Sequence, residues 1–138
     1  NVCTKTFKAL RIFVNKETTE LVEGIIKATK YVKIGGKIII ISFHSIEDKI
    51  VKFYFSNYSK NKSKPSRYFP EEKKENNEVF FENYRNDLLK PSEKEIKENP
   101  PSRSAKLRFA TRNKKTFFEP NNFRDRFKKY LDIEKINV

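Results

Sequence analysis

The sequence predicts an α/β fold, and the prediction rests mainly on residues 36–48. Four consecutive isoleucines, Ile38 to Ile41, follow a Gly-Gly turn. An unbroken run of β-branched residues is typical of a strand covered on both faces, as a central strand of a parallel sheet is. Polar residues, among them His44 and Ser45, follow the run and open a helical pattern. Ligands of such sheets bind beyond the carboxyl ends of the strands, so we expect a site here.

Two helices are predicted before this strand. Phe7, Leu10 and Val14 recur at helical spacing and predict a short amphipathic helix. A second helix is expected to be capped by Asn15 and to stop at the Gly-Gly turn. Its predicted apolar stripe consists of Leu21, Val22, Ile25, Ala28 and Val32.

The strand is predicted over residues 37–43 and a third helix directly after it. Ser45 is the expected N-cap, with Asp48 three residues further on as its partner in a capping box. Residues 59–78 are rich in Lys, Asn, Ser and Pro, which favours a mobile surface loop. The apolar positions of the third helix are Ile46, Ile50, Val51, Tyr54 and Tyr58.

The remaining elements are shorter. A strand is expected over 80–84, and one or two helical turns over 92–98, ending before two prolines. Residues 106–112 alternate, which predicts a half-buried strand with an apolar and a basic face. A short helix is expected from Asn122. Its aromatics and those just before it are expected to pack against the body; they are Phe117, Phe118, Phe123 and Phe127.

Composition points to a polyanionic partner. The chain has 138 residues, with 31 Lys and Arg against 18 Asp and Glu, for a net charge of +13. Basic residues interleave with aromatics, which favours nucleic acid, although an AT-rich genome that inflates Lys explains part of the charge equally well. With one Cys and one His, no internal disulfide and no metal site are expected. No signal peptide or long apolar run is seen, so we expect a cytoplasmic protein without membrane contact.

Two blocks are more specific: Ser-Phe-His-Ser-Ile-Glu-Asp at 42–48 and Ser-Arg-Ser-Ala-Lys-Leu-Arg at 102–108. A third, Thr-Phe-Lys-Ala-Leu-Arg-Ile, stands at 6–12. In this order and approximate spacing they resemble the C-terminal half of the RsmH (MraW) family. Its members are S-adenosylmethionine-dependent methyltransferases that act on N4 of a cytidine in 16S ribosomal RNA. The resemblance covers residues 1–112, leaving 113–138 as a basic aromatic tail.

The resemblance implies the C-terminal part of a class I (Rossmann-like) methyltransferase sheet. Residues 37–43 would form its fifth strand, and 80–84 and 106–112 its last two, one of them antiparallel. The cofactor, S-adenosylmethionine, would be bound mainly by residues N-terminal to Asn1, so no cofactor-binding residue is expected in this chain. The implied partner is 16S ribosomal RNA or the small ribosomal subunit; the oligomeric state is left open. Pro101 stands where the family has Arg, which removes one phosphate or carboxylate contact.

Each candidate residue has a structural alternative. His44 could contact the target base or a phosphate, or tie the strand end to nearby backbone, and the two readings carry equal weight. Ser45 could line the substrate side or simply cap the helix. Glu47 and Asp48 are expected to interact with the positive end of the helix dipole, and the alternative is that one of them accepts a proton. The expected RNA-binding residues are Arg11, Lys49, Arg103, Lys106 and Arg108. For Lys106 and Arg108 the alternative is a solvated strand face, and for Arg103 it is a structural salt bridge.

The leading hypothesis is therefore a part of a methyltransferase that supplies the substrate-side wall and an RNA-binding surface, and that is inactive alone. One alternative is a stand-alone basic RNA-binding module without catalysis. Another is an inactive remnant that serves as a structural partner. The absence of methionine and of a Gly-rich nucleotide loop makes a piece of a larger protein the expected case.

Overall fold

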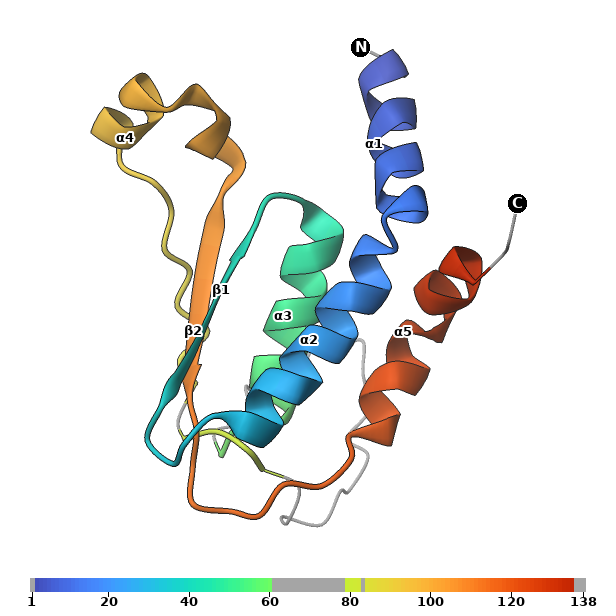
Figure 1. Ribbon diagram of the computed structural model, residues 1–138. Coiled ribbons are helices and arrows are strands. Elements are labelled where there is room, and N and C mark those ends of the chain that lie inside the picture. Colours follow the sequence, from blue (N-terminus) through green and yellow to red (C-terminus); the bar gives the residue numbers. More distant parts are fainter. Residues whose placement is uncertain (1, 61–78, 83, 136–138) are drawn as a thin grey trace, which may run out of the picture. The chain divides into compact units, whose positions relative to one another are not determined.

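The computed structural model describes residues 2–60, 79–82 and 84–135. They divide into two units, those within 1–28 and 119–138 and those within 29–118. No described helix is both long enough and apolar enough to cross a bilayer. The elements in chain order are α1 (Val2–Val14), α2 (Glu17–Tyr31), β1 (Lys37–Ser42), α3 (Ser45–Asn57), α4 (Glu93–Glu98), a 3₁₀ helix (Pro100–Ser104), β2 (Lys106–Thr111) and α5 (Asn121–Glu134) (Figure 1).

The first unit holds α1, most of α2, and α5. The Glu134 carboxylate, at the end of α5, accepts hydrogen bonds from the backbone N–H groups of Thr18 (3.0 Å) and Thr19 (2.8 Å). It thereby caps the start of α2, whose first N–H groups have no partner within the helix. The predicted cap was wrong: the Asn15 side chain donates instead to the Glu17 carboxylate (3.3 Å). No local pattern could have shown a cap 115 residues away.

A second contact ties α5 to α2. The Arg124 guanidinium binds the Glu23 carboxylate at 2.8 and 3.0 Å. Because of this bond, the pKa of Glu23 is lowered from its ordinary value, although burial opposes the shift. The helix predicted from Asn122 is confirmed as α5, which begins at Asn121 and is longer than expected. Helix α1 is confirmed as well, but its apolar residues Phe7 and Val14 are exposed.

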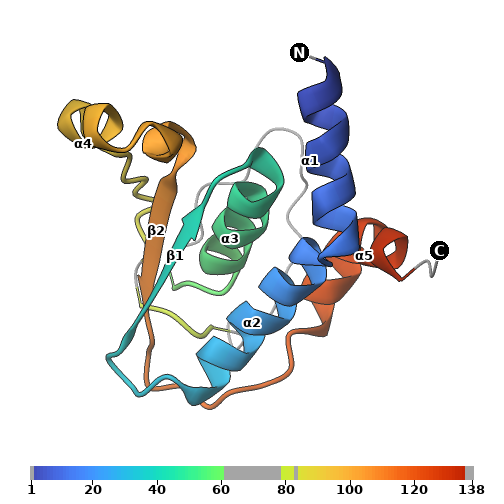
Figure 2. The same ribbon diagram turned by 45° about the horizontal axis from the view of Figure 1, so that its top comes forward.

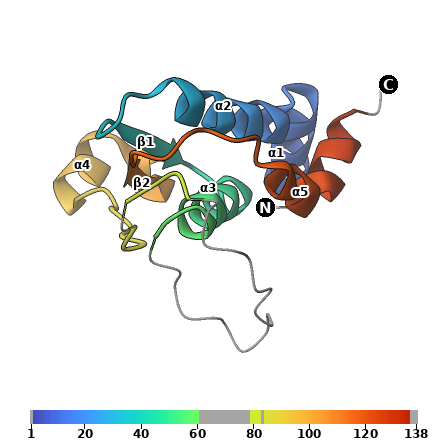
Figure 3. The same ribbon diagram turned by 90° about the horizontal axis from the view of Figure 1, so that it is seen from below.

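The second unit is built on an antiparallel strand pair. β1 pairs with β2 from Lys37 opposite Thr111 to Ser42 opposite Lys106. Helix α3 lies beside one face of the pair, as Figures 2 and 3 both show. Ile38 is buried, whereas Ile39 is 60% and Ile41 54% exposed.

The antiparallel partner agrees with the expectation that one of the last two strands runs antiparallel, whereas a central position of β1 in a parallel sheet stays a prediction. One face of β1 is covered, and the strand that pairs with it is antiparallel. An isoleucine run shows that both faces of a strand are apolar, but it carries no information about which element covers each face.

The predicted strand over 80–84 is corrected for its described residues. Among these, Phe81 alone forms bridges, to Ser59 and to Arg112. The segment contributes packing instead: the Phe80 ring lies 5.1 Å from that of Tyr58 and 4.2 Å from that of Phe118. The expectation that Phe117 and Phe118 pack against the body is thus confirmed.

The expected mobile loop over 59–78 falls largely on residues 61–78, which lie outside the described part. Its first residue, Ser59, is buried, and its hydroxyl accepts from the Tyr84 N–H (2.8 Å). After the loop, Ser92 caps α4 by accepting from the Glu95 N–H (3.2 Å), which confirms that helix.

Arg112, expected on a basic strand face, is 6% exposed. Its guanidinium donates to the carbonyl oxygens of Thr29 (3.2 Å), Phe80 (3.0 Å) and Lys115 (2.8 Å). It also donates to the side-chain oxygen of Asn113 (2.9 Å). One buried cation therefore joins the end of α2, the segment around Phe80 and the chain after β2.

Candidate functional site

The junction between β1 and α3 is closed by a capping box. His44 is the N-cap: its Nδ1 accepts from the Glu47 N–H at 3.3 Å. The Glu47 carboxylate accepts in return from the N–H groups of Phe43 (2.8 Å) and His44 (3.1 Å). The predicted cap was one residue too late, because Ser45 is the first residue of the helix and is exposed.

The His44 ring is buried and engaged by its own helix. Its Nε2 lies 3.2 Å from Glu47 Oε1. Since Nδ1 accepts a hydrogen bond, the proton of the neutral ring belongs on Nε2, facing that carboxylate. This geometry supports the structural reading of His44.

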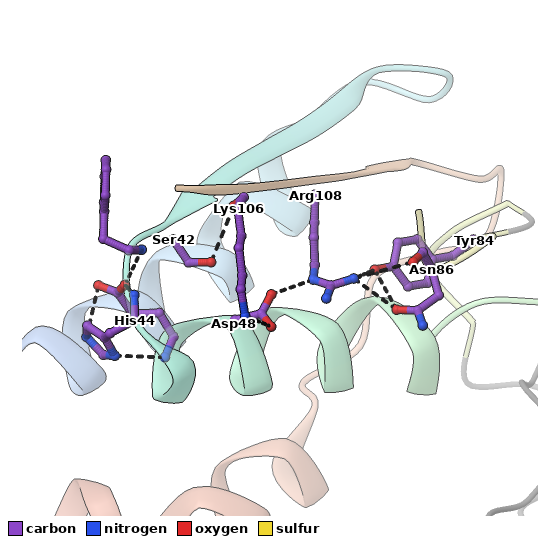
Figure 4. A network of polar contacts seen from close by, with 9 residues as sticks. Ser42, His44, Asp48, Tyr84, Asn86, Lys106 and Arg108 are labelled. Atoms are coloured by element: carbon purple, nitrogen blue, oxygen red, sulfur yellow. Dashed lines mark hydrogen bonds and ion pairs between the residues drawn. The ribbon is translucent and has the colours of Figure 1, made fainter. Parts of the chain in front are cut away.

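A polar network runs from the first turn of α3 to β2 and beyond (Figure 4). The Asp48 carboxylate accepts from Arg108 Nε at 2.7 Å and from Lys106 Nζ at 3.1 Å. Arg108 Nη1 donates onward to the Tyr84 hydroxyl (3.1 Å) and to Asn86 Oδ1 (2.9 Å). Three chain segments are thus fixed around one guanidinium.

The network also determines the protonation states of Asp48 and Tyr84. Burial tends to raise the pKa of Asp48, but the hydrogen bonds from Arg108 and Lys106 outweigh it and lower that pKa below its ordinary value. Burial raises the pKa of Tyr84 from its ordinary value, with the bond from Arg108 opposing. Asp48 is therefore a fixed anion and Tyr84 a neutral phenol, and this carboxylate is poorly suited to accept a proton from a substrate.

The structure places the expected RNA-binding residues in different surroundings. Lys49 and Arg103 are exposed. Arg11 belongs to the first unit and pairs with Glu17 at 2.8 Å. Lys106 keeps 34% of its side chain exposed while it pairs with Asp48.

Arg108 requires a correction. Alternation of 106–112 is confirmed, but Arg108 is 4% exposed and lies on the more buried face of β2. The carboxylate of α3 makes this burial possible, because a buried cation is tolerated where it is paired and hydrogen-bonded. Sequence alternation alone assigns the basic residues to solvent, so it chose the wrong face.

Sequence reasoning missed Tyr84 and Asn86 as members of this network. Asn86 has a φ of 60°, in the left-handed region that Asn tolerates better than most residues. The Asn86-Asp87 pair was the available signal for a turn there. Neither the turn nor the buried phenol could be connected to β2 without the fold.

The capping role of His44 predicts how substitutions behave. His44→Ala is expected to lower the free energy of unfolding by ~1 kcal/mol, because the Glu47 N–H loses its acceptor. His44→Asn should recover most of this loss, since Asn is among the best N-caps. Chemical denaturation followed by circular dichroism measures both. An alanine variant as stable as the original chain would show that the cap contributes nothing.

The glycines of this chain do not form a loop of the kind that binds a nucleotide-like cofactor. The three glycines of the chain lie within α2 (Gly24) and in the turn before β1 (Gly35 and Gly36). A glycine loop that binds a nucleotide-like cofactor follows a strand and opens a helix, where backbone N–H groups can approach the ligand.

Fold and site together define an α/β protein whose candidate site lies where a strand passes into a helix. The model of the MraW methylase family matches residues 1–113, so this chain belongs to that family. The "Ribosomal RNA small subunit methyltransferase H" of Agrobacterium fabrum is 41% identical over 109 residues, which are 79% of this chain and 31% of the relative. Its namesake in Bartonella bacilliformis is 44% identical over 109 residues, 79% of this chain and 32% of the relative.

The namesake in Ehrlichia chaffeensis is 44% identical over 105 residues, 76% of this chain and 32% of the relative. This chain thus spans about a third of the length of the curated relatives it matches. The family resemblance expected from the sequence blocks is confirmed. The match to the family ends at 113 and leaves α5 outside it.

Proposed function

We propose that this chain is part of an S-adenosylmethionine-dependent methyltransferase that modifies N4 of a cytidine in 16S ribosomal RNA. The observation that carries the proposal is the family match over residues 1–113 together with relatives named ribosomal RNA small subunit methyltransferase H. The chain supplies one wall of the substrate side. Residues outside this chain hold the cofactor, whose role is to supply the methyl group.

The reaction defines what such a wall has to do. The lone pair of an exocyclic amine is delocalised into the base, so the amine must be oriented and must lose a proton as or after the new bond forms. A paired cytidine is out of reach and must be presented unpaired or flipped. Rigid polar edges that hold a base and its phosphates suit this task better than mobile loops.

The candidate residues have different roles in this proposal. His44 and Ser45 stand at the carboxyl end of β1, where a substrate can be reached, and Ser45 is the exposed one of the two. Lys49 and Arg103 are exposed and supply phosphate contacts. Arg108 acts as a positioning residue, because its guanidinium is occupied by the network around Asp48.

A chimera tests the proposal. This chain replaces the aligned region of the Bartonella bacilliformis relative, and transfer of a labelled methyl group to small-subunit ribosomal RNA is measured. We expect transfer, with the label recovered as N4-methylated cytidine after digestion of the RNA. A folded chimera that binds S-adenosylmethionine but transfers no methyl group would overturn the proposal.

His44 variants of the same chimera separate its two readings. If the ring only caps α3, His44→Asn should restore methyl transfer lost in His44→Ala. If the imidazole contacts the base or a phosphate, His44→Asn should restore stability and leave transfer low.

The alternative, an RNA-binding module without catalysis, is favoured by one observation, the net charge of +13. The 138-residue chain would then bind RNA, while the chimera would be inactive. An inactive remnant would show neither property.

A further inference from the structure

A second basic surface lies at the end of the strand pair opposite the candidate site. The turn between α2 and β1 is bonded to the residue that follows β2. The Gly35 N–H donates to the Arg112 carbonyl, and the Arg112 N–H donates to the Gly36 carbonyl, both at 2.9 Å. Residues 29–37 and 112–115, distant in sequence, therefore share one surface.

The turn is held in a fixed shape. Gly35 has a φ of 78°, which an L side chain rarely adopts. A Cβ on Gly36 would lie 2.8 Å from the Val32 side chain and 2.9 Å from the Lys33 carbonyl. The buried Arg112 guanidinium fixes the backbone under this surface, because it donates to the carbonyl oxygens of Thr29 and Lys115. The side chains of this surface are thus displayed on a rigid base.

Its charge is of one sign. Lys30, Lys33, Lys37 and Lys114 are exposed, and together with Tyr31 we call them the turn patch. No Asp or Glu occurs in 29–46 or 99–118. The backbone N–H of Glu82 donates to Thr111 nearby, but the Glu82 carboxylate pairs with Lys60 at 2.6 Å. The turn patch therefore presents net positive charge, which attracts a polyanion.

An aromatic ring stands among these cations. Tyr31 is 76% exposed. Lys30 Nζ lies 5.7 Å from the centre of the Tyr31 ring and 6.0 Å from that of the Phe117 ring. Exposed aromatic rings beside cations are the means by which proteins bind single-stranded nucleic acid: the ring stacks on a base and the cations neutralise phosphates.

The site end of the same strands differs. There, Lys106 and Arg108 both pair with Asp48, which offsets one of their two positive charges. β1 has six residues, so about 17 Å separates its two ends. The turn patch therefore adds positive charge remote from the place where a base would react, beyond that of Lys49 and Arg103 near the site.

We propose that the turn patch binds single-stranded RNA, with Tyr31 stacked on a base and the four lysines on flanking phosphates. This inference rests on the proposed function only for its choice of RNA, which would be a ribosomal RNA segment away from the methylated base. Such a contact raises affinity for the substrate and leaves the chemical step unchanged. In the chimera, loss of the patch should raise KM for RNA with kcat preserved.

The direct test uses the 138-residue chain and a short fluorescent single-stranded RNA, with affinity measured by anisotropy over a series of salt concentrations. Neutralising three lysines of the patch (Lys33→Gln, Lys37→Gln, Lys114→Gln) should lower the slope of log K against log salt by about 2. The matched control neutralises three exposed lysines elsewhere in the second unit: Lys52→Gln, Lys90→Gln and Lys97→Gln. The control should change the slope by less than half as much.

The aromatic contribution is tested separately. Tyr31→Ala should weaken RNA binding by roughly 5- to 100-fold and leave the salt slope unchanged, whereas Tyr31→Phe should bind as the original chain does. Melting curves of all variants provide the check on folding, since every altered side chain is exposed.

Three outcomes would overturn the inference. Equal slope losses in the patch and control variants would mean that only net charge matters. Undiminished binding by Tyr31→Ala would remove the stacking contact. Ile34 is also exposed beside the patch, so binding to phosphatidylglycerol vesicles without binding to RNA would assign the surface to a membrane instead.

The inference and the proposed function fail in different ways. An active chimera whose patch variant binds RNA normally would leave the methyltransferase proposal standing and remove the patch. An inactive chimera, together with a slope loss confined to the patch variant, would remove the methyltransferase proposal and leave the turn patch standing.

Discussion

Arg112→Leu is expected to lower the free energy of unfolding by at least ~3 kcal/mol, since it removes all the hydrogen bonds by which one buried guanidinium joins separate parts of the chain. The guanidinium satisfies oxygens from the end of α2, from the Phe80 segment and from the chain after β2. It also lies over the Phe80 ring, with Cζ 5.5 Å from the ring centre. Leucine replaces part of the volume and none of the hydrogen bonds.

Urea denaturation, with Arg103→Leu as the matched control, measures this effect. Arg103 is exposed, so its replacement should change stability by no more than ~0.5 kcal/mol. Arg112→Lys should fall between the two, because an ammonium group cannot reproduce the planar fork of donors. Equal stabilities for Arg112→Leu and Arg103→Leu would show that the hydrogen bonds of Arg112 add no net stability.

The second large effect concerns Asp48 and Arg108. Asp48→Leu should cost about 3 kcal/mol, because it leaves a buried guanidinium without a carboxylate. Arg108→Met should cost less, since Lys106 remains to pair with Asp48. The double variant should be no less stable than Asp48→Leu alone, because replacing both partners removes the unpaired charge.

A double-mutant cycle on unfolding free energies checks this order. If the stability loss of the double variant equals the sum of the two single losses, Asp48 and Arg108 do not act as a pair.

The same pair predicts a dependence on pH. The pKa of Asp48 is lower in the folded chain than its ordinary value of about 4. Its contribution to stability is therefore complete above pH ~4 and is lost as the pH falls through the folded pKa. The double variant should lack this part of the acid destabilisation, which denaturation at a series of acidic pH values would reveal.

Local chemistry determined much of the fold. The isoleucine run, the Gly-Gly turn and the polar residues after them were enough to place β1 and α3 within a residue or so. Ser92 predicted the start of α4, and alternation predicted β2. These features depend on residues close in sequence, so periodicity and capping preferences could identify them. The sequence blocks also determined the family, which the match over 1–113 confirms.

Only the tertiary structure decided which partner each polar side chain takes. Alternation placed Arg108 toward solvent, but the carboxylate of Asp48, on another element, made its burial favourable. Glu134 caps α2 from 115 residues away, in place of Asn15. Arg112 binds carbonyls of two distant segments, at Thr29 and Phe80. Sequence patterns report whether a side chain is polar or apolar, whereas a buried charge is stable only through partners that the folded chain brings to it.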